Sequence, residues 1–491
     1  MRALMGIDVG TSSVRSLILD PRGRILSVCR EEYRFDIPEI GWAEQDPEVW
    51  WHAVCRTARR AVGQAGLGGG EIGAVGFSGQ MHGLVPVTRS GEPVRRAIIW
   101  CDQRSAEQVR AIRESLGAAL GRYTCNTVNT GSLVASLKWM QENERENYAR
   151  TFAVLLPKDY VRFRMTGRIS TDWTDAAGTL AFDVARGCWS EEFLGRLGLH
   201  VELFPEVLAP SDVAGPLAPA AAEAMGLSTD CLVVHGGADQ VMQALGNGIL
   251  EPGVASVTIG TGGQVLSLLT EPRYDPGLSS HTFNYLARGQ WYFMGATLCA
   301  GLSLRWLRDH VLSGLSYGDM AALAAEVPPG SEGLVYLPYL LGERTPHMDP
   351  GARGMFFGLS MKHERGHLIR AAMEGVVYSL KECFAVLEAL GIRVREVVAS
   401  GGGSRSPLWL QLQADILNKE IYLSDMSEQA SLGAAINAGV GVGCFDSYSS
   451  ACRGIVTRSP NPYVPDPENA ARYGEGFERY KALYRNTREL M

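Results

Sequence analysis

Two strand–turn–strand segments, about half a chain apart, constrain the fold of this sequence more than any other feature. The first is MGIDVGTSS at residues 5–13, which is followed at once by the apolar run VRSLILD. The second is VASVTIGTGGQVLSLL, around Ile259. Taken alone, the first hairpin fits an ordinary polar turn as well as it fits a tip whose N–H groups and hydroxyls bind a phosphate. The repetition favours the phosphate reading and predicts two related domains with a nucleotide between them.

Length and composition set the class of protein. A chain of 491 residues exceeds what one hydrophobic core supports, and 46% hydrophobic with 20% charged residues indicates a globular protein of two domains. The net charge of −7 argues against nucleic acid or an anionic membrane as a partner. Ten cysteines without a CxxC pair fit reduced thiols. Because no apolar run is long enough to span a membrane and a core strand begins near residue 3, we expect a cytoplasmic protein.

Several predicted strands end in polar clusters. Alternating strands and helices favour an α/β architecture, in which ligands gather beyond the carboxyl ends of the strands. The strand IGAVGF runs into SGQMHG, AIIW runs into CDQR, and CLVVHGGADQ carries Asp239. Asp8 and Asp239 are therefore expected at strand ends, where one acid can position a metal and phosphate and the other can deprotonate a hydroxyl. Buried acids at strand ends can also be turn caps.

The second half of the chain has its own pattern. A glycine-rich linker at residues 246–253 has the composition of a hinge and divides the chain into residues 1–246 and 247–491. Residues 120–230 are less regular and resemble an insertion. A long amphipathic helix is predicted over residues 367–387. The predicted strand VREVVAS is followed by GGGSRSP. At such a glycine-rich turn the backbone can approach a flat or anionic ligand. A lone triple glycine is, however, more often a flexible turn.

One motif is a decoy. HERGH, which begins at His363, matches the HExxH pattern of zinc proteases. That pattern needs both histidines on one helix face and a third ligand downstream, whereas Gly366 weakens the helix and no matching His or Glu constellation follows in an obvious place. We interpret the histidines as the polar start of the long helix. The chain also has no GxxxxGK[ST] loop and no HRD or DFG set, so any use of ATP must rest on other elements.

Taken in order, these segments resemble the FGGY family of carbohydrate kinases, which shares the actin, hexokinase and Hsp70 ATPase fold. The matching segments are DVGTSS, SGQMHG, WCDQR, LPKDY, TDAAGT, GGADQ, IGTGG, RAAMEGV, ASGGGSRSPLWLQLQADIL and LGAA. The resemblance implies two actin-like (ribonuclease H-like) α/β domains with a cleft between them: residues 1–246 with the sugar site and catalytic aspartate, and residues 247–491 with the nucleotide. SGQMHG, LPKDY and TDWTDAAGT are most similar to xylulokinases, which implies phosphorylation of a ketopentose, D-xylulose above all, by ATP with Mg²⁺.

The resemblance also implies roles for individual residues. Asp239 matches the general base, and Asp8 matches the acid that holds magnesium. The sugar pocket is matched by Met81, His82, Asp239 and Gln240, and Trp100 and Asp102 match positions next to it. Contacts with the γ-phosphate are matched by Thr11, Ser12 and Arg15, the second phosphate loop by Thr261 and Gly262, and the adenine side by Gly401, Gly402 and Gly403. The sequence departs from many xylulokinases at Gln240, where asparagine is usual, at Arg15, where lysine is usual, and in GTGG, where GTSG is usual.

Three functional classes stay open on the sequence alone. The leading one is an ATP-dependent ketose kinase for D-xylulose. The second is a kinase of the same family for ribulose, L-xylulose or a sugar alcohol. The third is a non-catalytic nucleotide-binding or sugar-sensing module, which would need a peptide- or DNA-binding segment that the pattern does not show. The implied partners are a small sugar and ATP, without nucleic acid or membrane, and a homodimer is a family expectation.

Overall fold

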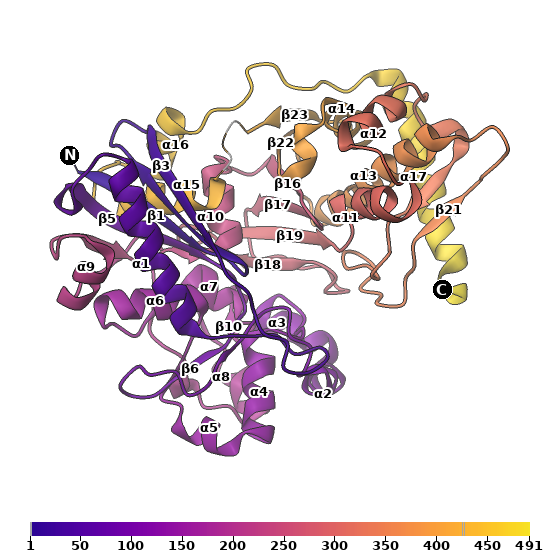
Figure 1. Cartoon of the computed structure of the whole chain (residues 1–491). Coiled ribbons are helices and arrows are strands. Elements are labelled where there is room, and N and C mark those ends of the chain that lie inside the picture. Colours follow the sequence, from indigo (N-terminus) through magenta and orange to yellow (C-terminus); the bar gives the residue numbers. More distant parts are fainter. Residues whose placement is uncertain (1, 425, 427) are drawn as a thin grey trace. The chain divides into compact units, whose positions relative to one another are not determined.

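The computed structural model describes residues 2–424, 426 and 428–491, and the chain forms two compact units (Figure 1). Unit 1 comprises Met1–Leu250, Thr282–Trp291 and Met426–Thr457, and unit 2 comprises Glu251–His281, Tyr292–Asp425 and Arg458–Met491. Each unit is a β-sheet flanked by helices, so the predicted α/β class is confirmed. Within the described residues, no helix is both long enough and apolar enough to cross a bilayer.

The sheet of unit 1 is centred on the first strand of the chain. β1 (Ala3–Val9) pairs antiparallel with β2 (Ser13–Leu19), which confirms the first predicted hairpin, and parallel with β5 (Ile72–Gly79). The strand order is β13-β14-β5-β1-β2-β3, with β15 paired to the end of β5. The remaining strands of this sheet are β3 (Ile25–Glu32), β13 (Val213–Pro216), β14 (Leu232–Val234) and β15 (Gly237–Ala238).

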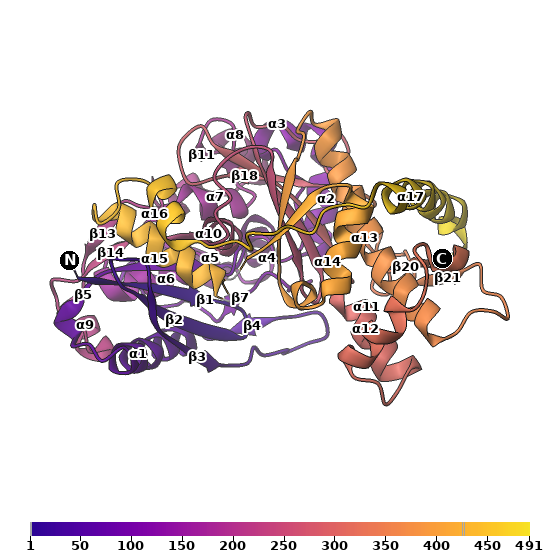
Figure 2. The ribbon, with the colours of Figure 1, turned by 90° about the horizontal axis from the view of Figure 1, so that it is seen from above.

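Two helices cover opposite faces of this sheet (Figure 2). α1 (Pro47–Gln64), capped by Asp46, packs on β2 and β3, and α15 (Gln429–Gly441) packs on β1 and β5. α15 lies very close to the sheet, because a Cβ on Gly6 would be 1.9 Å from a carbonyl oxygen of α15 and one on Gly76 would be 2.1 Å from another. Gly6 pairs with Gly76 and Asp8 with Ser78 in register. Since side chains alternate along a strand, Asp8 and Ser78 share the face of α15.

The segment expected to be irregular is instead a set of short elements. Its helices are α3 (Leu120–Thr124), α4 (Leu133–Asn143), α5 (Arg145–Arg150), α6 (Pro157–Thr166), α7 (Trp173–Gly178), α8 (Glu191–Leu197) and α9 (Pro219–Met225), and α2 (Ala106–Leu116) precedes them. Short strand pairs are β4 (Glu44–Gln45) with β7 (Ala97–Ile98), β6 (Val85–Val87) with β8 (Ala153–Leu155), β9 (Thr171–Asp172) with β12 (Val207–Leu208), and β10 (Phe182–Asp183) with β11 (Cys188–Trp189). LPKDY lies at the start of α6, and TDWTDAAGT covers β9 and α7. Unit 1 also contains α10 (Asp239–Gly246) and α16 (Tyr448–Ile455), and both pack against α15.

Unit 2 is built on the second predicted hairpin. β16 (Val254–Ile259) pairs antiparallel with β17 (Gly263–Leu269) and parallel with β22 (Glu396–Ser400), in the order β19-β17-β16-β22-β23. The other strands from this half of the chain are β18 (His281–Asn284), β19 (Trp291–Thr297), β20 (Val335–Leu337), β21 (Met355–Phe357) and β23 (Glu420–Leu423). The helices are α11 (Gly301–Trp306), α12 (Tyr317–Ala325), α13 (Arg365–Ala389), α14 (Pro407–Leu417) and α17 (Pro467–Thr487). The hairpin and the long helix α13 are both as predicted.

The decoy motif lies at the start of α13. The helix begins at Arg365, so His363 lies outside it. His363 Nδ1 accepts a hydrogen bond from the Ser360 N–H at 2.9 Å, and His367 Nδ1 accepts one from the Glu364 N–H at 3.1 Å. His367 therefore lies in the first turn and bonds the N-cap residue, while His363 lies in the loop just before the helix, which agrees with their interpretation as its polar start.

Candidate active site

Asp8 lies on β1 with 6% of its surface exposed. Ser78 Oγ donates a hydrogen bond to its Oδ1 at 2.8 Å, and Arg15 Nη1 contacts its Oδ2 at 3.3 Å. Burial raises the pKa of Asp8, while the bonds with Ser78 and Arg15 act in the opposite direction. The strand pairing fixes this group, because Asp8 faces Arg15 across the hairpin and Ser78 across the parallel pair. Ser78 belongs to a recognised motif, but nothing in the sequence singles it out as a partner of Asp8.

Asp239 is the first residue of α10 and directly follows β15. The predicted strand is interrupted between β14 and β15, where Gly236 has a φ of 79°, and resumes beside the end of β5. Oδ1 of Asp239 is buried and has no hydrogen-bond partner among the residues that the structure describes. Burial raises the pKa of Asp239 to about 7, and the neighbouring Asp8 carboxylate contributes to the rise. An aspartate with a free oxygen and a pKa near neutrality can accept a proton from a bound hydroxyl.

A glutamate from the far end of the sequence joins this group. Glu428, just before α15, contacts Arg15 Nε through its Oε2 at 3.1 Å. Burial raises the pKa of Glu428, while the cationic Arg15 lowers it and the Asp8 carboxylate raises it. Arg15 thus lies between two acids. No motif in the sequence predicts Glu428, because it reaches the site only through the packing of α15 on the sheet.

The turn between β1 and β2 is held by polar side chains. Thr11 Oγ1 accepts a hydrogen bond from Trp100 Nε1 at 2.8 Å and donates one to Gln80 Oε1 at 3.3 Å. Gln45 Nε2 donates to the Thr11 carbonyl at 2.8 Å. Ser12, at the tip of the turn, is exposed. The structure therefore brings Trp100, expected near the sugar, into contact with a residue expected near the phosphate.

Met81 and His82 follow the end of β5. Met81 is buried, and His82 has a φ of 70°, a conformation that is uncommon for a residue with a side chain. His82 Nδ1 donates a hydrogen bond to the Gly178 carbonyl at the end of α7, because a carbonyl oxygen can only accept. Gln240, beside Asp239, hydrogen-bonds the Asp239 carboxyl through its backbone and side chain and lowers its pKa.

Asp102 has a different environment from these residues. It is fully buried, and its oxygens accept hydrogen bonds from the Ala43 N–H at 2.6 Å and from Arg104. The Arg104 guanidinium also contacts Asp102 at 2.8 Å and lies 3.7 Å from the centre of the Trp42 ring. Asp102 therefore fixes the loop that carries Trp100, two residues away, with both carboxylate oxygens already in use.

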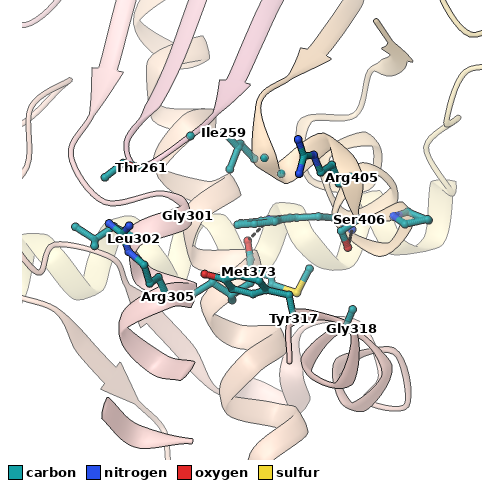
Figure 3. A pocket seen from close by; sticks show the side chains of 17 residues that line it. Ile259, Thr261, Gly301, Leu302, Arg305, Tyr317, Gly318, Met373, Arg405 and Ser406 are labelled. Atoms are coloured by element: carbon teal, nitrogen blue, oxygen red, sulfur yellow. Dashed lines mark hydrogen bonds between the residues drawn. The ribbon is translucent and has the colours of Figure 1, made fainter. Parts of the chain in front are cut away.

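Unit 2 contains a cavity of about 530 Å³ at the carboxyl ends of β16 and β22 (Figure 3). Apolar and aromatic side chains, including Tyr317, Met373 and Trp409, form much of its lining, and Arg305 and Arg405 add two cations. Trp409 Nε1 donates to the Met373 carbonyl at 3.2 Å, which fixes the indole. Apolar walls with a few polar groups are typical of a small-molecule site of this size. The sequence analysis assigned no role to these five residues, although Arg405 lies in the GGGSRSP segment, and Met373 and Trp409 lie in segments that match the family.

The glycine turns expected near a nucleotide lie at this cavity. Thr261, Gly402 and Gly403 line it, and Gly262 and Gly401 adjoin them in the chain. Gly401 has a φ of 80°, and a Cβ there would be 2.7 Å from the Ile259 carbonyl oxygen, so only glycine lets β22 turn beside β16. The Thr261 carbonyl accepts hydrogen bonds from the N–H groups of Ala300 and Leu302, which ties the second hairpin to α11. The aromatic walls, glycine turns and cations together fit a base and its phosphates.

The carboxylates of unit 1 show whether the expected Mg²⁺ has a fitting site there. Across residues 2–424, 426 and 428–491, no three His, Cys, Asp or Glu side chains gather as a metal cage. Mg²⁺ is commonly held by only one or two carboxylates together with water and substrate phosphates. Asp8, with Asp239 near enough to be affected by its charge, fits such a site.

Comparison with known proteins identifies the family. The N-terminal domain of the FGGY family of carbohydrate kinases matches residues 3–246, and its C-terminal domain matches residues 255–442. A xylulose kinase of Lactococcus lactis subsp. lactis is 35% identical, over 100% of this chain and 98% of that protein. A gluconokinase of Bacillus subtilis is 30% identical, over 96% of this chain and 93% of that protein.

The fold agrees with a solved structure of similar length. The xylulose kinase of Rhodospirillum rubrum superposes with a TM-score of 0.93 at 28% identity, over 100% of this chain and 99% of that one. Both domains of the family, the full-length relatives and the structural match lead to the same assignment. This chain belongs to the FGGY family of carbohydrate kinases, which are phosphotransferases that use ATP.

Proposed function

We propose that this kinase transfers the γ-phosphoryl group of ATP to a ketopentose, D-xylulose above all, and forms D-xylulose 5-phosphate. The observation that carries the proposal is the buried, unpartnered Oδ1 of Asp239, whose carboxyl has a pKa of about 7. Such a group favours catalysis over a purely nucleotide-sensing role. The substrate choice is supported by the xylulose kinase relative at 35% identity over the full chain, with gluconate or another polyol as the alternative.

Asp239 is the proposed general base. Its free carboxylate oxygen takes the proton of the sugar's primary hydroxyl while that oxygen forms a bond to the γ-phosphorus. The bond from phosphorus to the bridging oxygen breaks, and ADP leaves with that electron pair. With a pKa of about 7, about half of the Asp239 carboxyl groups are ionised near neutral pH. The ionised form is then also basic enough to accept the proton.

Asp8, Thr11, Ser12 and Arg15 are the proposed phosphate side of unit 1. Arg15, held between Asp8 and Glu428, supplies a positive charge next to the β1–β2 turn. Asp8 is the residue that would hold Mg²⁺, and a bound Mg²⁺ would neutralise charge on the phosphate oxygens. Local positive charge from Arg15 and Mg²⁺ is needed, because a protein with a net charge of −7 does not attract ATP.

The sugar site is proposed to consist of Met81, His82, Asp239, Gln240 and Trp100. A ketose is neutral and polar, so imidazole, amide and carboxylate groups suit its hydroxyls. Gln240 stands where many xylulokinases have asparagine, and its longer side chain bonds Asp239. We assign Asp102 a supporting role through the Trp100 loop, because both its oxygens are already bonded.

We assign the sugar and the catalytic aspartate to the domain of residues 1–246, and the nucleotide to that of residues 247–491. The cavity of unit 2 supports the second assignment, with Thr261 and Gly262 beside the phosphates and Gly401, Gly402 and Gly403 beside the adenine. The ten cysteines are free thiols, which supports a reducing compartment such as the cytoplasm. A homodimer stays a prediction.

The substrate is tested with a panel of sugars. In a coupled ADP-release assay with pentuloses, polyols and gluconate, we expect D-xylulose to give the highest kcat/KM. A polyol or gluconate that exceeds it by tenfold or more, equivalent to about 1.4 kcal/mol, would contradict the substrate but not the kinase activity. The full-length match to a gluconokinase makes gluconate the most informative competitor.

The role of His82 is tested by two substitutions. His82→Ala should raise KM for the sugar much more than KM for ATP, because the ring is proposed to accept a hydroxyl. His82→Asn is the matched variant, since its amide can keep the bond to the Gly178 carbonyl while it lacks Nε2. Both variants should show the effect. A normal sugar KM in His82→Asn would instead restrict the histidine to holding Gly178.

A further inference from the structure

A cluster of five charged side chains is completely buried in unit 1, beneath the candidate site. Lys158 Nζ lies 2.7 Å from Asp159 Oδ1, 2.7 Å from Asp172 Oδ2 and 3.1 Å from Asp175 Oδ2, and Arg162 contacts Asp159 at 3.2 Å. All five side chains are fully buried. Burial raises the pKa of Asp175 well above its usual value, and the cluster places two basic side chains against three acidic ones. None of these residues has a part in the proposed phosphoryl transfer.

The first connection runs from this cluster to the catalytic aspartate. Asp172 Oδ1 accepts a hydrogen bond from Thr174 Oγ1 at 2.5 Å, and Thr174 Oγ1 in turn accepts one from the Ala238 N–H at 2.9 Å. The direction is fixed, because the backbone N–H can only donate, which leaves the threonine hydroxyl proton for Asp172. Ala238 immediately precedes Asp239, so the threonine hydroxyl holds the backbone from which Asp239 projects.

A second connection reaches the same segment from the other side. Arg162 Nη1 donates to Ser170 Oγ at 2.6 Å, and Ser170 Oγ lies 3.0 Å from His235 Nε2. His235 Nδ1 donates to the Asp212 carbonyl at 2.8 Å, which leaves Nε2 to accept from the serine hydroxyl. Burial lowers the pKa of His235 to about 3, so the ring is neutral and this arrangement is the stable one. His235 directly follows β14, so through Ser170 the cluster is connected to the break between β14 and β15 that precedes Asp239.

The stem of Lys158 also lies against the strand that carries Ser78. A Cβ on Gly79 would be 2.7 Å from Lys158 Cβ, so the two backbones pack without space between them. The end of β5 pairs with β15, and its Ser78 bonds Asp8. The Lys158 side chain thus packs against β5, whose Ser78 bonds Asp8 and whose end pairs with β15, the strand just before Asp239.

We propose that Lys158, Asp172 and Thr174 are positioning residues that hold Asp239 in the geometry needed to take the sugar proton. The proposal rests on the role of Asp239 as general base. The hydrogen-bonded chain ends at the residue before Asp239, and among the described residues the Thr174 hydroxyl bonds only Asp172 and the Ala238 N–H. Of the three residues, Thr174 can be replaced with the smallest change of volume while the hydrogen bond to the Ala238 N–H is lost.

The test replaces the threonine in the full-length enzyme. Thr174→Val has nearly the same shape but cannot accept from the Ala238 N–H, and Thr174→Ser keeps the hydroxyl as the matched control. We expect Thr174→Val to lower kcat on the order of 10- to 100-fold with little change in KM for sugar or ATP, because misplacement of a catalytic group slows the chemical step. Thr174→Ser should keep kcat near that of the wild type. Should Thr174→Val fold poorly by circular dichroism, Thr174→Cys, with a weaker hydrogen-bonding group, is expected to give an intermediate kcat.

A double-substitution cycle separates positioning from a general structural role. If Thr174 acts through Asp239, adding Thr174→Val to Asp239→Asn should reduce kcat by less than half the logarithmic loss seen in the wild-type background. Fully additive losses would overturn the proposal. Unchanged kcat in Thr174→Val, with a strong loss in Asp239→Asn, would overturn positioning and leave the general base intact. A nearly active Asp239→Asn would instead overturn the general base itself.

Discussion

Replacing Asp239 by asparagine is expected to lower kcat by about 10²–10⁴-fold, the usual contribution of a general base. Asparagine keeps the size of the side chain and one acceptor oxygen but loses the charge and the basicity. The measurement is ADP release at saturating sugar and ATP. Sugar binding, followed by calorimetry, should fall far less, because the amide oxygen can still accept a hydroxyl proton in a hydrogen bond.

The pH dependence supplies the signature of the same group. Burial places the pKa of Asp239 at about 7, so the ionised form is lost as the pH falls through that value. For the wild type, kcat/KM should therefore fall about tenfold per pH unit well below pH 7, and the asparagine variant should lack this acid limb. Asp230→Asn, an exposed acid in the same unit, is the matched control and should keep the wild-type profile. Retention of more than a tenth of the wild-type kcat in Asp239→Asn would direct attention to Asp8.

The second large effect concerns stability. Lys158→Met should lower the free energy of unfolding of unit 1 by about 3–5 kcal/mol, the usual result of removing one partner from a buried ion pair. Methionine fills a similar volume but leaves Asp159 and Asp172 with Arg162 as the only cation close to them in the cluster. Urea unfolding followed by tryptophan fluorescence measures the loss, and the slope of the transition should stay unchanged.

A surface lysine serves as the matched control. Lys138 pairs with Glu142 at 3.2 Å on α4, and 23% of its side chain and 45% of that of Glu142 are exposed. Lys138→Met should change the unfolding free energy by no more than about 0.5 kcal/mol, because exposed ion pairs contribute little. Equal effects of the two substitutions would mean that the buried cluster contributes nothing beyond an ordinary surface pair.

The sequence predicts the elements that depend on short-range patterns. Both hairpins are found because an apolar strand, a glycine turn and a second apolar strand are contiguous, and Asp8 is placed on its strand for the same reason. Asp239 is placed only approximately. The sequence suggests one continuous strand, whereas Gly236 interrupts it and Asp239 begins a helix. A left-handed glycine within an apolar run leaves no trace in its hydrophobic pattern.

The remaining features depend on contacts between distant segments. Glu428 meets Arg15, and Thr174 meets Ala238, only after helices dock on the sheet. The hydrophobic pattern of residues 120–230 is irregular for a different reason. Helix α6 buries Lys158 and Arg162, so charged residues occupy core positions and the expected apolar periodicity is absent. Buried, mutually neutralised charges are therefore what sequence patterns of hydrophobicity miss in this protein.

The close approach of α15 to the first sheet has a consequence for biosynthesis. The ribosome releases β1 and β5 early, but the helix that covers the backbone at Gly6 and Gly76 is among the last segments to emerge. Until then, the backbone at Gly6 and Gly76 is not covered by α15, and Arg15 lacks its second acid. Unit 1 is thus completed by a segment far along the sequence, so a nascent or truncated polypeptide that stops before residue 426 has all the strands of its sheet and both aspartates but lacks the helix that covers β1 and β5.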